Sequence, residues 1–224
     1  MAATMAWPGM KIQYTYHRAK RNSRVLGRFV FFATFVFSSS PVTVALTSTV
    51  YNFDIDLADS DRSVYETLAL RVARHPSESE DYLVARVLAY AMEYTEGIEF
   101  SSGGLSSPDD PALVVRDLTG TVLSWIEIGT PNAERLHRAS KSARRVAVYV
   151  HRDPKQFLGR LAGERIHRAE ALELWGIDPG LLAALTARLE RRMNFSLAIA
   201  ERELFVSAGT ETLSGPVTRL SVKA

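Results

Sequence analysis

Two acidic side chains, Asp117 and Glu127, occur on neighbouring segments that both have strand-like sequences. Around Glu127, Trp125 and Gly129 share its side of the strand, because side chains alternate along a strand. A glutamate flanked by two isoleucines in a buried strand is costly unless its carboxylate has a partner. A second carboxylate nearby raises that cost unless a cation or a basic side chain lies between the two. This pattern is typical of a Mg²⁺-dependent phosphodiesterase site.

The elements that must position these acids alternate between strands and helices. Strands are predicted at 49–59, 64–74, 113–116, 122–128, 146–150 and 170–176, with one or two more within 195–208 and 217–222. Helices are predicted from 77 to about 96, from 132 to about 143, at 154–168 and from 178 to about 192. Hairpins together with strand–helix units predict an α/β fold in which helices flank a mixed central sheet and an N-terminal β-hairpin comes first.

A third acid, Glu78, lies at the predicted start of the first helix. Ser77 and Glu80 have the spacing of a capping box, which places Glu78 in the first helical turn. A carboxylate there is stabilised by the helix dipole, so Glu78 could have that structural role alone. Asp117 could similarly be only a turn residue before Gly120.

Composition excludes several classes of site. The 224 residues include no cysteine, so disulfides, thiolate zinc sites and cysteine nucleophiles are excluded. The five histidines show no close metal-binding spacing. Neither GxxxxGK[ST] nor GxGxxG occurs, so we expect no nucleotide cofactor.

Residues 1–43 differ in charge from the remaining chain. They carry six basic side chains and no acid, whereas residues 44–224 carry 21 basic and 25 acidic side chains, a net charge of −4. That net charge argues against a broadly basic nucleic-acid-binding surface and leaves room for a local basic patch.

The segment 1–43 has three interpretations. Its basic and apolar runs resemble a signal peptide with a candidate cleavage site near Ala45, which would export the protein. It could also be a tethering tail, although the apolar run contains Arg28 and is too short for a membrane span. We favour a mis-called start, with a GTG codon read as Val44. Residues 44–224 are then a cytoplasmic domain with no membrane segment.

Several motifs recur together in an order that resembles a known family. They are Thr49-Val-Tyr51 with Phe53, Ala73-Arg-His-Pro-Ser-Glu78, Arg86 with Leu88 and Ala89, Asp117, Trp125-Ile-Glu-Ile-Gly-Thr-Pro131, and Arg135 with Ala139 and Ala143. From about Ala45 onward the chain resembles the YaeQ family. Its order of elements resembles the αβββαβ core of the restriction-endonuclease-like PD-(D/E)XK nuclease superfamily.

The resemblance implies that Asp117 and Glu127 coordinate Mg²⁺ and that Glu78 completes or tunes the site. The metal would polarise a phosphate of DNA or RNA and activate a water. The ordinary nuclease pattern has a lysine two residues after the glutamate, but this chain has Gly129, which is the form found in the family. The family supplies a basic residue from the next helix instead, and that position is Arg138 here.

Arginine is a poor general base because its pKa is very high. Lys141, one turn further along the helix, could take that role. Arg135, Arg138, Lys141 and Arg145 recur at three- and four-residue spacing and could share one side of the helix. Alternatively, Arg138 or Lys141 could form a structural salt bridge with Glu127.

Two functions therefore stay open from the sequence. The first is Mg²⁺-dependent hydrolysis of phosphodiester bonds in DNA or RNA. The second is an inactive nuclease-fold protein that acts as an interaction or nucleic-acid-binding module, which the net charge and the missing lysine favour. The sequence does not assign an oligomeric state.

Overall fold

The structure is a computed structural model that describes residues 6–7, 10–11, 48–101 and 110–222. The chain divides into two compact units, Met1–Thr43 and Val44–Ala224. In the first unit, β1 (Ala6–Trp7) pairs antiparallel with β2 (Met10–Lys11). Most of the predicted extension and of the polar loop at 101–111 lies outside the described residues.

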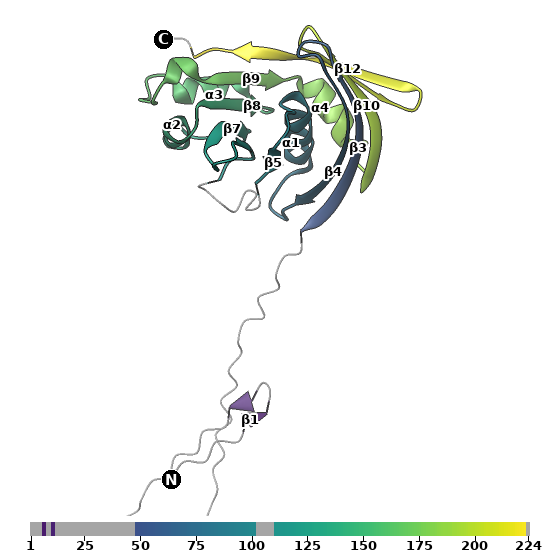
Figure 1. The fold of residues 1–224 in the computed structure, drawn as a ribbon, viewed down its shortest axis with the longest axis horizontal. Coiled ribbons are helices and arrows are strands. Elements are labelled where there is room, and N and C mark those ends of the chain that lie inside the picture. The colour runs from purple at the N-terminus through teal and green to yellow at the C-terminus, as the bar shows by residue number, and fades with distance from the viewer. Residues whose placement is uncertain (1–5, 8–9, 12–47, 102–109, 223–224) are drawn as a thin grey trace, which may run out of the picture. The chain divides into compact units, whose positions relative to one another are not determined.

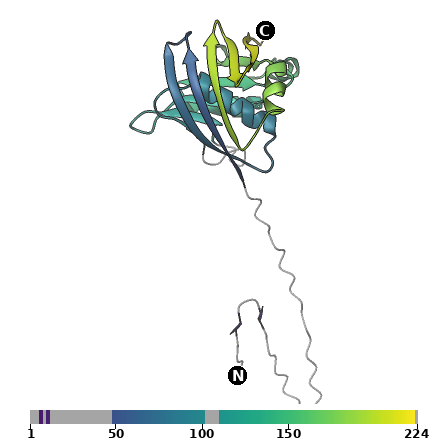
Figure 2. The same cartoon turned by 90° about the vertical axis from the view of Figure 1, so that its right-hand side faces the viewer.

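One sheet of ten described strands organises the second unit. The strands are β3 (Thr49–Asp59), β4 (Val64–Arg74), β5 (Ile98–Phe100), β6 (Leu113–Arg116), β7 (Val122–Ile128), β8 (Arg145–Val150), β9 (Glu173–Ile177), β10 (Arg192–Ala200), β11 (Glu203–Ala208) and β12 (Glu211–Leu220). Their order is β4-β3-β10-β11-β12-β9-β8-β7-β6-β5. Strands β7, β8 and β9 run parallel, as do β3 and β10, and the other pairs are antiparallel. The predicted α/β class with a mixed sheet is confirmed. The sheet curves into a nearly closed barrel, which an αβββαβ core does not describe (Figures 1 and 2).

Four described α-helices pack on the two faces of this sheet. They are α1 (Glu80–Met92), α2 (Ala133–Ser142), α3 (Pro154–Leu161) and α4 (Pro179–Thr186), and a short 3-10 helix, η2 (Ala169–Ala171), precedes β9. Helices α1 and α4 lie inside the curve of the sheet, whereas α2 and α3 lie outside it (Figure 1). None of the described helices is long and apolar enough to cross a membrane.

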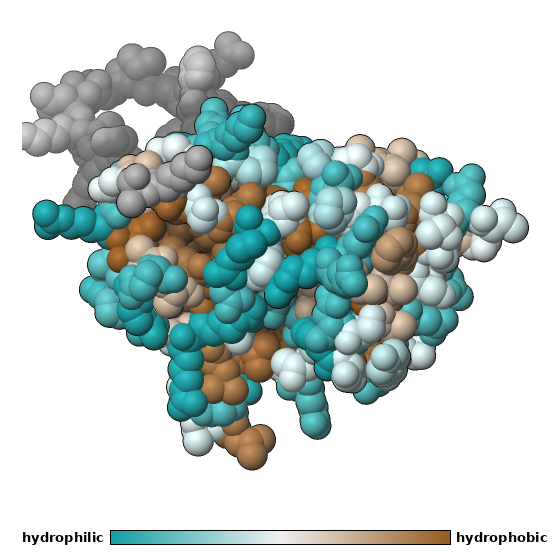
Figure 3. Space-filling model, turned by 90° about the horizontal axis from the view of Figure 1, so that it is seen from above, coloured by the Kyte–Doolittle hydropathy of each residue, from teal (hydrophilic) through white to brown (hydrophobic). Residues whose placement is uncertain are grey.

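Each face of the sheet has its own hydrophobic core. Alternation along β7 sends Ile126 and Ile128 to the core around α1 and α4, and sends Trp125 to the core beneath α2 and α3. Hydrophobic residues also show between hydrophilic ones on the surface seen from above (Figure 3), as is usual for folded proteins. Glu127 shares the side of Trp125, and for that reason it faces the outer layer of helices.

The boundaries of several elements differ from the predictions. Helix α1 begins after Ser79, two residues later than predicted, so Glu78 precedes the helix and the capping box at Ser77 is wrong. Helices α3 and α4 end six or seven residues early, since Gly163 adopts φ +80° after α3 and β10 already begins at Arg192. The C-terminal part forms three strands where one or two were predicted.

Candidate functional site

The candidate site lies where the parallel strands β7 and β8 end. Ile128 pairs with Tyr149, and the Gly129 amide donates to the Tyr149 carbonyl at 2.8 Å, so the two carboxyl ends are level. In α/β sheets, functional groups commonly gather at this edge because several chain segments leave the sheet there. Glu127 and His151 belong to these two strand ends, and Asn132 begins α2 beside them.

Glu127 is buried and tied to α2. Its side chain is 5% exposed, and Oε1 accepts hydrogen bonds from Nε1 of Trp125 at 2.6 Å and Nε of Arg135 at 2.7 Å. Burial raises the pKa of Glu127, and the bonds from Arg135 and Trp125 offset part of that rise. The alternative of a structural salt bridge at Glu127 is therefore observed, but its partner is Arg135 instead of Arg138 or Lys141.

Glu78 forms a second buried ion pair. Oε1 of Glu78 lies 3.0 Å from Nη2 of Arg86, and the two side chains are 1% and 4% exposed. Oε2 also accepts a hydrogen bond from the His75 amide at 3.0 Å. Burial raises the pKa of Glu78, while Arg86 and the His75 bond lower it. The carboxylate is thus held in place before α1 begins.

Tyr82, on the first turn of α1, lies within electrostatic reach of both acids. Burial raises its pKa to about 12, Arg86 opposes that rise, and both Glu127 and Glu78 add to it. The phenol is therefore a neutral hydrogen-bond donor near both carboxylates at neutral pH. We call Glu78, Tyr82, Glu127, Gly129 and His151 the Glu127 site.

His151 completes the site from the end of β8. Its Nε2 lies 3.5 Å from Oδ2 of Asp81, which Arg152 also binds at 2.6 Å. The ring packs edge-on against Tyr82, with 5.9 Å between ring centroids. Gly129 adopts φ +91°, and a Cβ there would lie 3.5 Å from Cε1 of His151. The imidazole therefore borders the space that a side chain at Gly129 would enter.

Asp117 does not belong to this site, and its expected pairing with Glu127 is wrong. It lies in the β6–β7 turn, where its amide donates to the Thr121 carbonyl and its carboxylate accepts from Thr119 and Thr121. Glu127 lies six residues beyond Thr121 along the strand, about 20 Å at the usual rise of about 3.3 Å per residue. The hydrogen bond from the Thr119 hydroxyl is the largest cause of the lowered pKa of Asp117. The carboxylate thus acts in the turn, at the opposite end of β7.

The basic residues predicted to share one face of α2 have different positions in the structure. Arg135 reaches Glu127, whereas Arg138 and Lys141 are exposed on later turns. Arg145 is not on the helix, because α2 ends at Ser142 and Arg145 opens β8. Its guanidinium binds Glu93 and Glu173, each at 2.6 Å, so it joins α1 to the sheet and has no part in the site.

A local excess of basic residues nevertheless covers the outer layer of helices. Residues 134–168 contain ten Lys or Arg and three Asp or Glu, within a unit whose net charge is −4. We call this segment, which includes α2 and α3, the basic layer. Its exposed basic side chains include Lys141, Arg144, Lys155, Arg160 and Arg165.

The carboxylates predicted to bind Mg²⁺ are held by other contacts. Within 48–101 and 110–222, no group of three or more His, Asp or Glu side chains could hold a metal ion. Mg²⁺ often takes only one or two carboxylates with several waters. Glu127 and Glu78, however, are already paired with Arg135 and Arg86. The two carboxylates in this arrangement do not fit Mg²⁺.

Sequence reasoning missed Tyr82, Asp81 as a partner of His151, and His151 itself. One signal was present for His151, since it directly follows the buried run at 146–150 and so stands at the carboxyl end of a parallel strand. The sequence contains no such signal for Tyr82, because its position near Glu127 and His151 depends on how α1 crosses the sheet.

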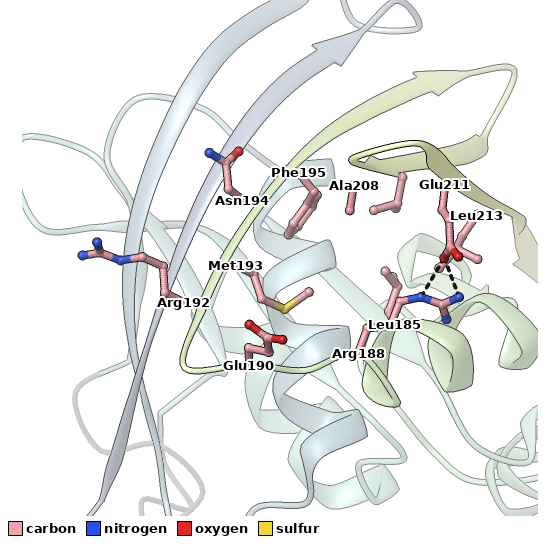
Figure 4. A pocket seen from close by; sticks show the side chains of 11 residues that line it. Leu185, Arg188, Glu190, Arg192, Met193, Asn194, Phe195, Ala208, Glu211 and Leu213 are labelled. Carbon is pink, nitrogen blue, oxygen red and sulfur yellow. Dashed lines mark hydrogen bonds and ion pairs between the residues drawn. The ribbon is translucent and has the colours of Figure 1, made fainter.

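A separate cavity of about 260 Å³ lies between the end of α4 and strands β10 to β12. Figure 4 shows its apolar floor, with Met193 and Phe195, and one wall formed by the ion pair of Arg188 and Glu211. No residue of the Glu127 site lines it.

Comparisons with known proteins agree on one family. The family model described as YaeQ protein matches residues 44–216. The uncharacterized protein YaeQ of Salmonella typhi is 29% identical over 176 residues, which cover 78% of this chain and 97% of that protein. The protein of the same name from Escherichia coli (strain K12) is 27% identical over the same shares.

Solved structures give the same result. The crystal structure of YaeQ protein from Pseudomonas syringae matches with a TM-score of 0.70 and 31% identity, over 78% of this chain and 96% of that one. The YaeQ protein from Xanthomonas axonopodis pv. citri matches with a TM-score of 0.69 and 28% identity, over 77% and 98%. The chain therefore belongs to the YaeQ family.

Proposed function

We propose that this YaeQ-family protein hydrolyses phosphodiester bonds of DNA or RNA at the Glu127 site, with the substrate phosphates held along the basic layer. The order α1-β5-β6-β7-α2-β8 supports a relation to the PD-(D/E)XK nucleases, since it repeats a helix, three strands, a helix and a strand.

One observation carries the proposal. Arg135, on the first turn of α2, fixes the buried carboxylate of Glu127, and the later turns of the same helix begin the basic layer. A phosphate chain lying along that layer would pass beside Glu127 and Tyr82. Phosphate contacts from Lys and Arg supply most of the sequence-independent affinity for nucleic acid.

The residues of the site have separate roles in this proposal. Lys141 and Arg144, near the start of β8, neutralise backbone phosphates along the basic layer, away from the cut. Tyr82, which stays protonated at neutral pH, donates a hydrogen bond to a phosphate oxygen as charge develops there. Glu127 orients Arg135. Arg138 remains a phosphate-binding candidate, and this proposal assigns no metal to Glu127, Glu78 or Asp117.

A cleavage assay tests the proposal. The full chain is incubated with labelled single- and double-stranded DNA and RNA in Mg²⁺, in Mn²⁺ and in EDTA. Glu127→Gln should abolish cleavage, whereas the same change at Glu66, exposed on β4, should leave it intact. Cleavage that survives Glu127→Gln overturns the proposed site. Loss of cleavage in EDTA would restore the metal prediction.

The second candidate is a protein that binds nucleic acid without cutting it. The observation that favours it is the neutralisation of both buried acids by arginines. Binding without cleavage by the wild-type chain, in every ion, would establish this candidate over the first.

The basic layer is tested by its salt dependence. Arg144→Ala/Arg160→Ala should weaken binding and reduce the slope of log K against log salt by about 2, since each lost phosphate contact removes about 0.9 on duplex DNA. Arg71→Ala/Arg192→Ala removes two exposed arginines from β4 and β10 and is the matched control. An equal loss of nucleic-acid affinity in both double variants would show that the nucleic acid does not bind along the basic layer.

A further inference from the structure

We propose that Asp81 and His151 form a proton-accepting dyad that activates the attacking water at the Glu127 site. This inference rests on the proposed function and names two residues that the comparisons do not assign.

The contacts of His151 define which nitrogen can accept a proton. Nε2 lies 3.5 Å from Oδ2 of Asp81, so a proton on Nε2 faces a carboxylate. Arg152 holds that carboxylate through two hydrogen bonds, at 2.6 and 2.8 Å. Burial raises the pKa of Asp81, but hydrogen bonds from Ser79 and Arg152 outweigh it and lower the pKa overall, which keeps Asp81 ionised. Nδ1 is then left with its lone pair.

Nδ1 of His151 is an unpaired acceptor in a buried place. The side chain is 6% exposed, and Nδ1 has no hydrogen-bond partner within the residues that the structure describes. Unpaired buried polar atoms are rare, because they lose their bonds to water without replacement. A proton donor that arrives with the substrate accounts for this one.

Nδ1 also points toward the site. It lies 4.0 Å from the position that a Cβ at Gly129 would take, and Cε2 of Tyr82 lies 4.0 Å from the same position. Gly129 directly follows the end of β7, two residues after Glu127. The acceptor therefore faces the strand end at which the phosphate is proposed to bind. The partly buried Tyr82 ring must move aside to admit the water.

In the proposed step, water attacks the phosphorus atom while His151 accepts a proton. Nδ1 takes a proton from water while the water oxygen forms a bond to phosphorus. The bond from phosphorus to the leaving oxygen breaks, and that oxygen keeps the electron pair and takes a proton from solvent. The imidazolium then returns its proton to solvent. Burial lowers the pKa of His151, and Asp81 offsets part of that change, so the ring is neutral and able to accept at neutral pH.

The test measures kcat/KM against pH for the full chain, with the polynucleotide that the wild type cleaves fastest. His151→Ala should lower kcat/KM about 100-fold or more, the usual contribution of a general base, and imidazole should restore part of it. Asp81→Asn should move the acidic limb of the pH profile to lower pH, because the imidazolium loses its carboxylate. A residue with only a packing role would show neither effect. Tyr65→Ala, which removes an exposed aromatic ring from β4, outside both the site and the basic layer, is the matched control.

The outcomes separate the dyad from the proposed function. Cleavage by His151→Ala with an unchanged pH profile overturns the dyad, while loss in Glu127→Gln still upholds the site. A second outcome also overturns the dyad. In it, His151→Ala is inactive, has a lowered melting temperature and is not rescued by imidazole, and Asp81→Asn leaves the pH profile unchanged. A wild-type chain that cleaves none of the polynucleotides overturns both.

Discussion

Replacing Arg86 with methionine should lower the free energy of unfolding by about 3–5 kcal/mol, because it leaves the Glu78 carboxylate buried without its counter-charge. Nη2 of Arg86 lies 3.0 Å from Oε1 of Glu78 and also donates to the Ala73 carbonyl at 2.9 Å. Both side chains are almost fully buried, so solvent does not screen the loss. Methionine keeps much of the volume, and the effect therefore reports charge more than a cavity.

The loss of unfolding free energy in Arg86→Met should depend on pH. Burial raises the pKa of Glu78 in the folded state above its ordinary value of 4.5. The folded state then binds this proton more tightly than the unfolded state does, so this contribution to stability falls as pH rises through the folded pKa. Without Arg86 the pKa of Glu78 rises further. The gap between wild type and variant should narrow as pH falls, by up to about 1.4 kcal/mol per pH unit.

Urea unfolding followed by circular dichroism, at about pH 5 and about pH 8, measures both effects. Arg188→Met is the control, because its pair with Glu211 is largely exposed and should be worth less than about 1 kcal/mol. Arg86→Met/Glu78→Gln should recover part of the loss, since both charges are removed. The reasoning is refuted by a gap that stays constant with pH, or by equal losses in Arg86→Met and Arg188→Met.

Three further predictions concern other parts of the domain. Gly215→Ala should cost about 1–3 kcal/mol by overpacking, seen as a lower Cm in urea, because its Cβ would lie 2.8 Å from Cβ of both Asp178 and Leu181. Asp117→Ala should leave the rate of polynucleotide cleavage unchanged, and a large loss would contradict its position outside the site. Asn132→Ala should cost about 1 kcal/mol in urea unfolding, because the Asn132 side chain caps α2 by accepting from the backbone amide at its third residue at 2.8 Å.

The elements that the sequence predicted correctly are those with a local signal. Strands β3 and β4 match the predicted bounds, since alternating burial and a short polar turn are both readable within one hairpin. Asn132 was predicted as the N-cap of α2 and has that role. Such signals depend only on near neighbours in the chain.

The wrong boundaries occur where tertiary packing decides between helix and strand. The sequence predicts that a helix extends to about Arg192, yet Arg192 begins β10, which pairs in parallel with β3 some 140 residues earlier in the sequence. The alternation that starts near Met193 is the pattern of a strand with one buried face. Nearby sequence could not show that the helix predicted over 178–192 ends early, because the strand that pairs with β10 is distant in sequence.

Some positions in the site follow from strand register in the sequence, and others do not. Asp117 and Glu127 flank a tight turn at Gly120, so counting outward from the turn places residue 111 or 112 opposite Glu127, and the observed pairing of Leu113 with Ile126 agrees. The register of a hairpin could therefore have excluded Asp117 from the sequence alone. No count relates Glu127 to His151, because α2 lies between their strands and sets the parallel register. The misplaced ligand was an avoidable error, whereas the unpaired imidazole could be found only in three dimensions.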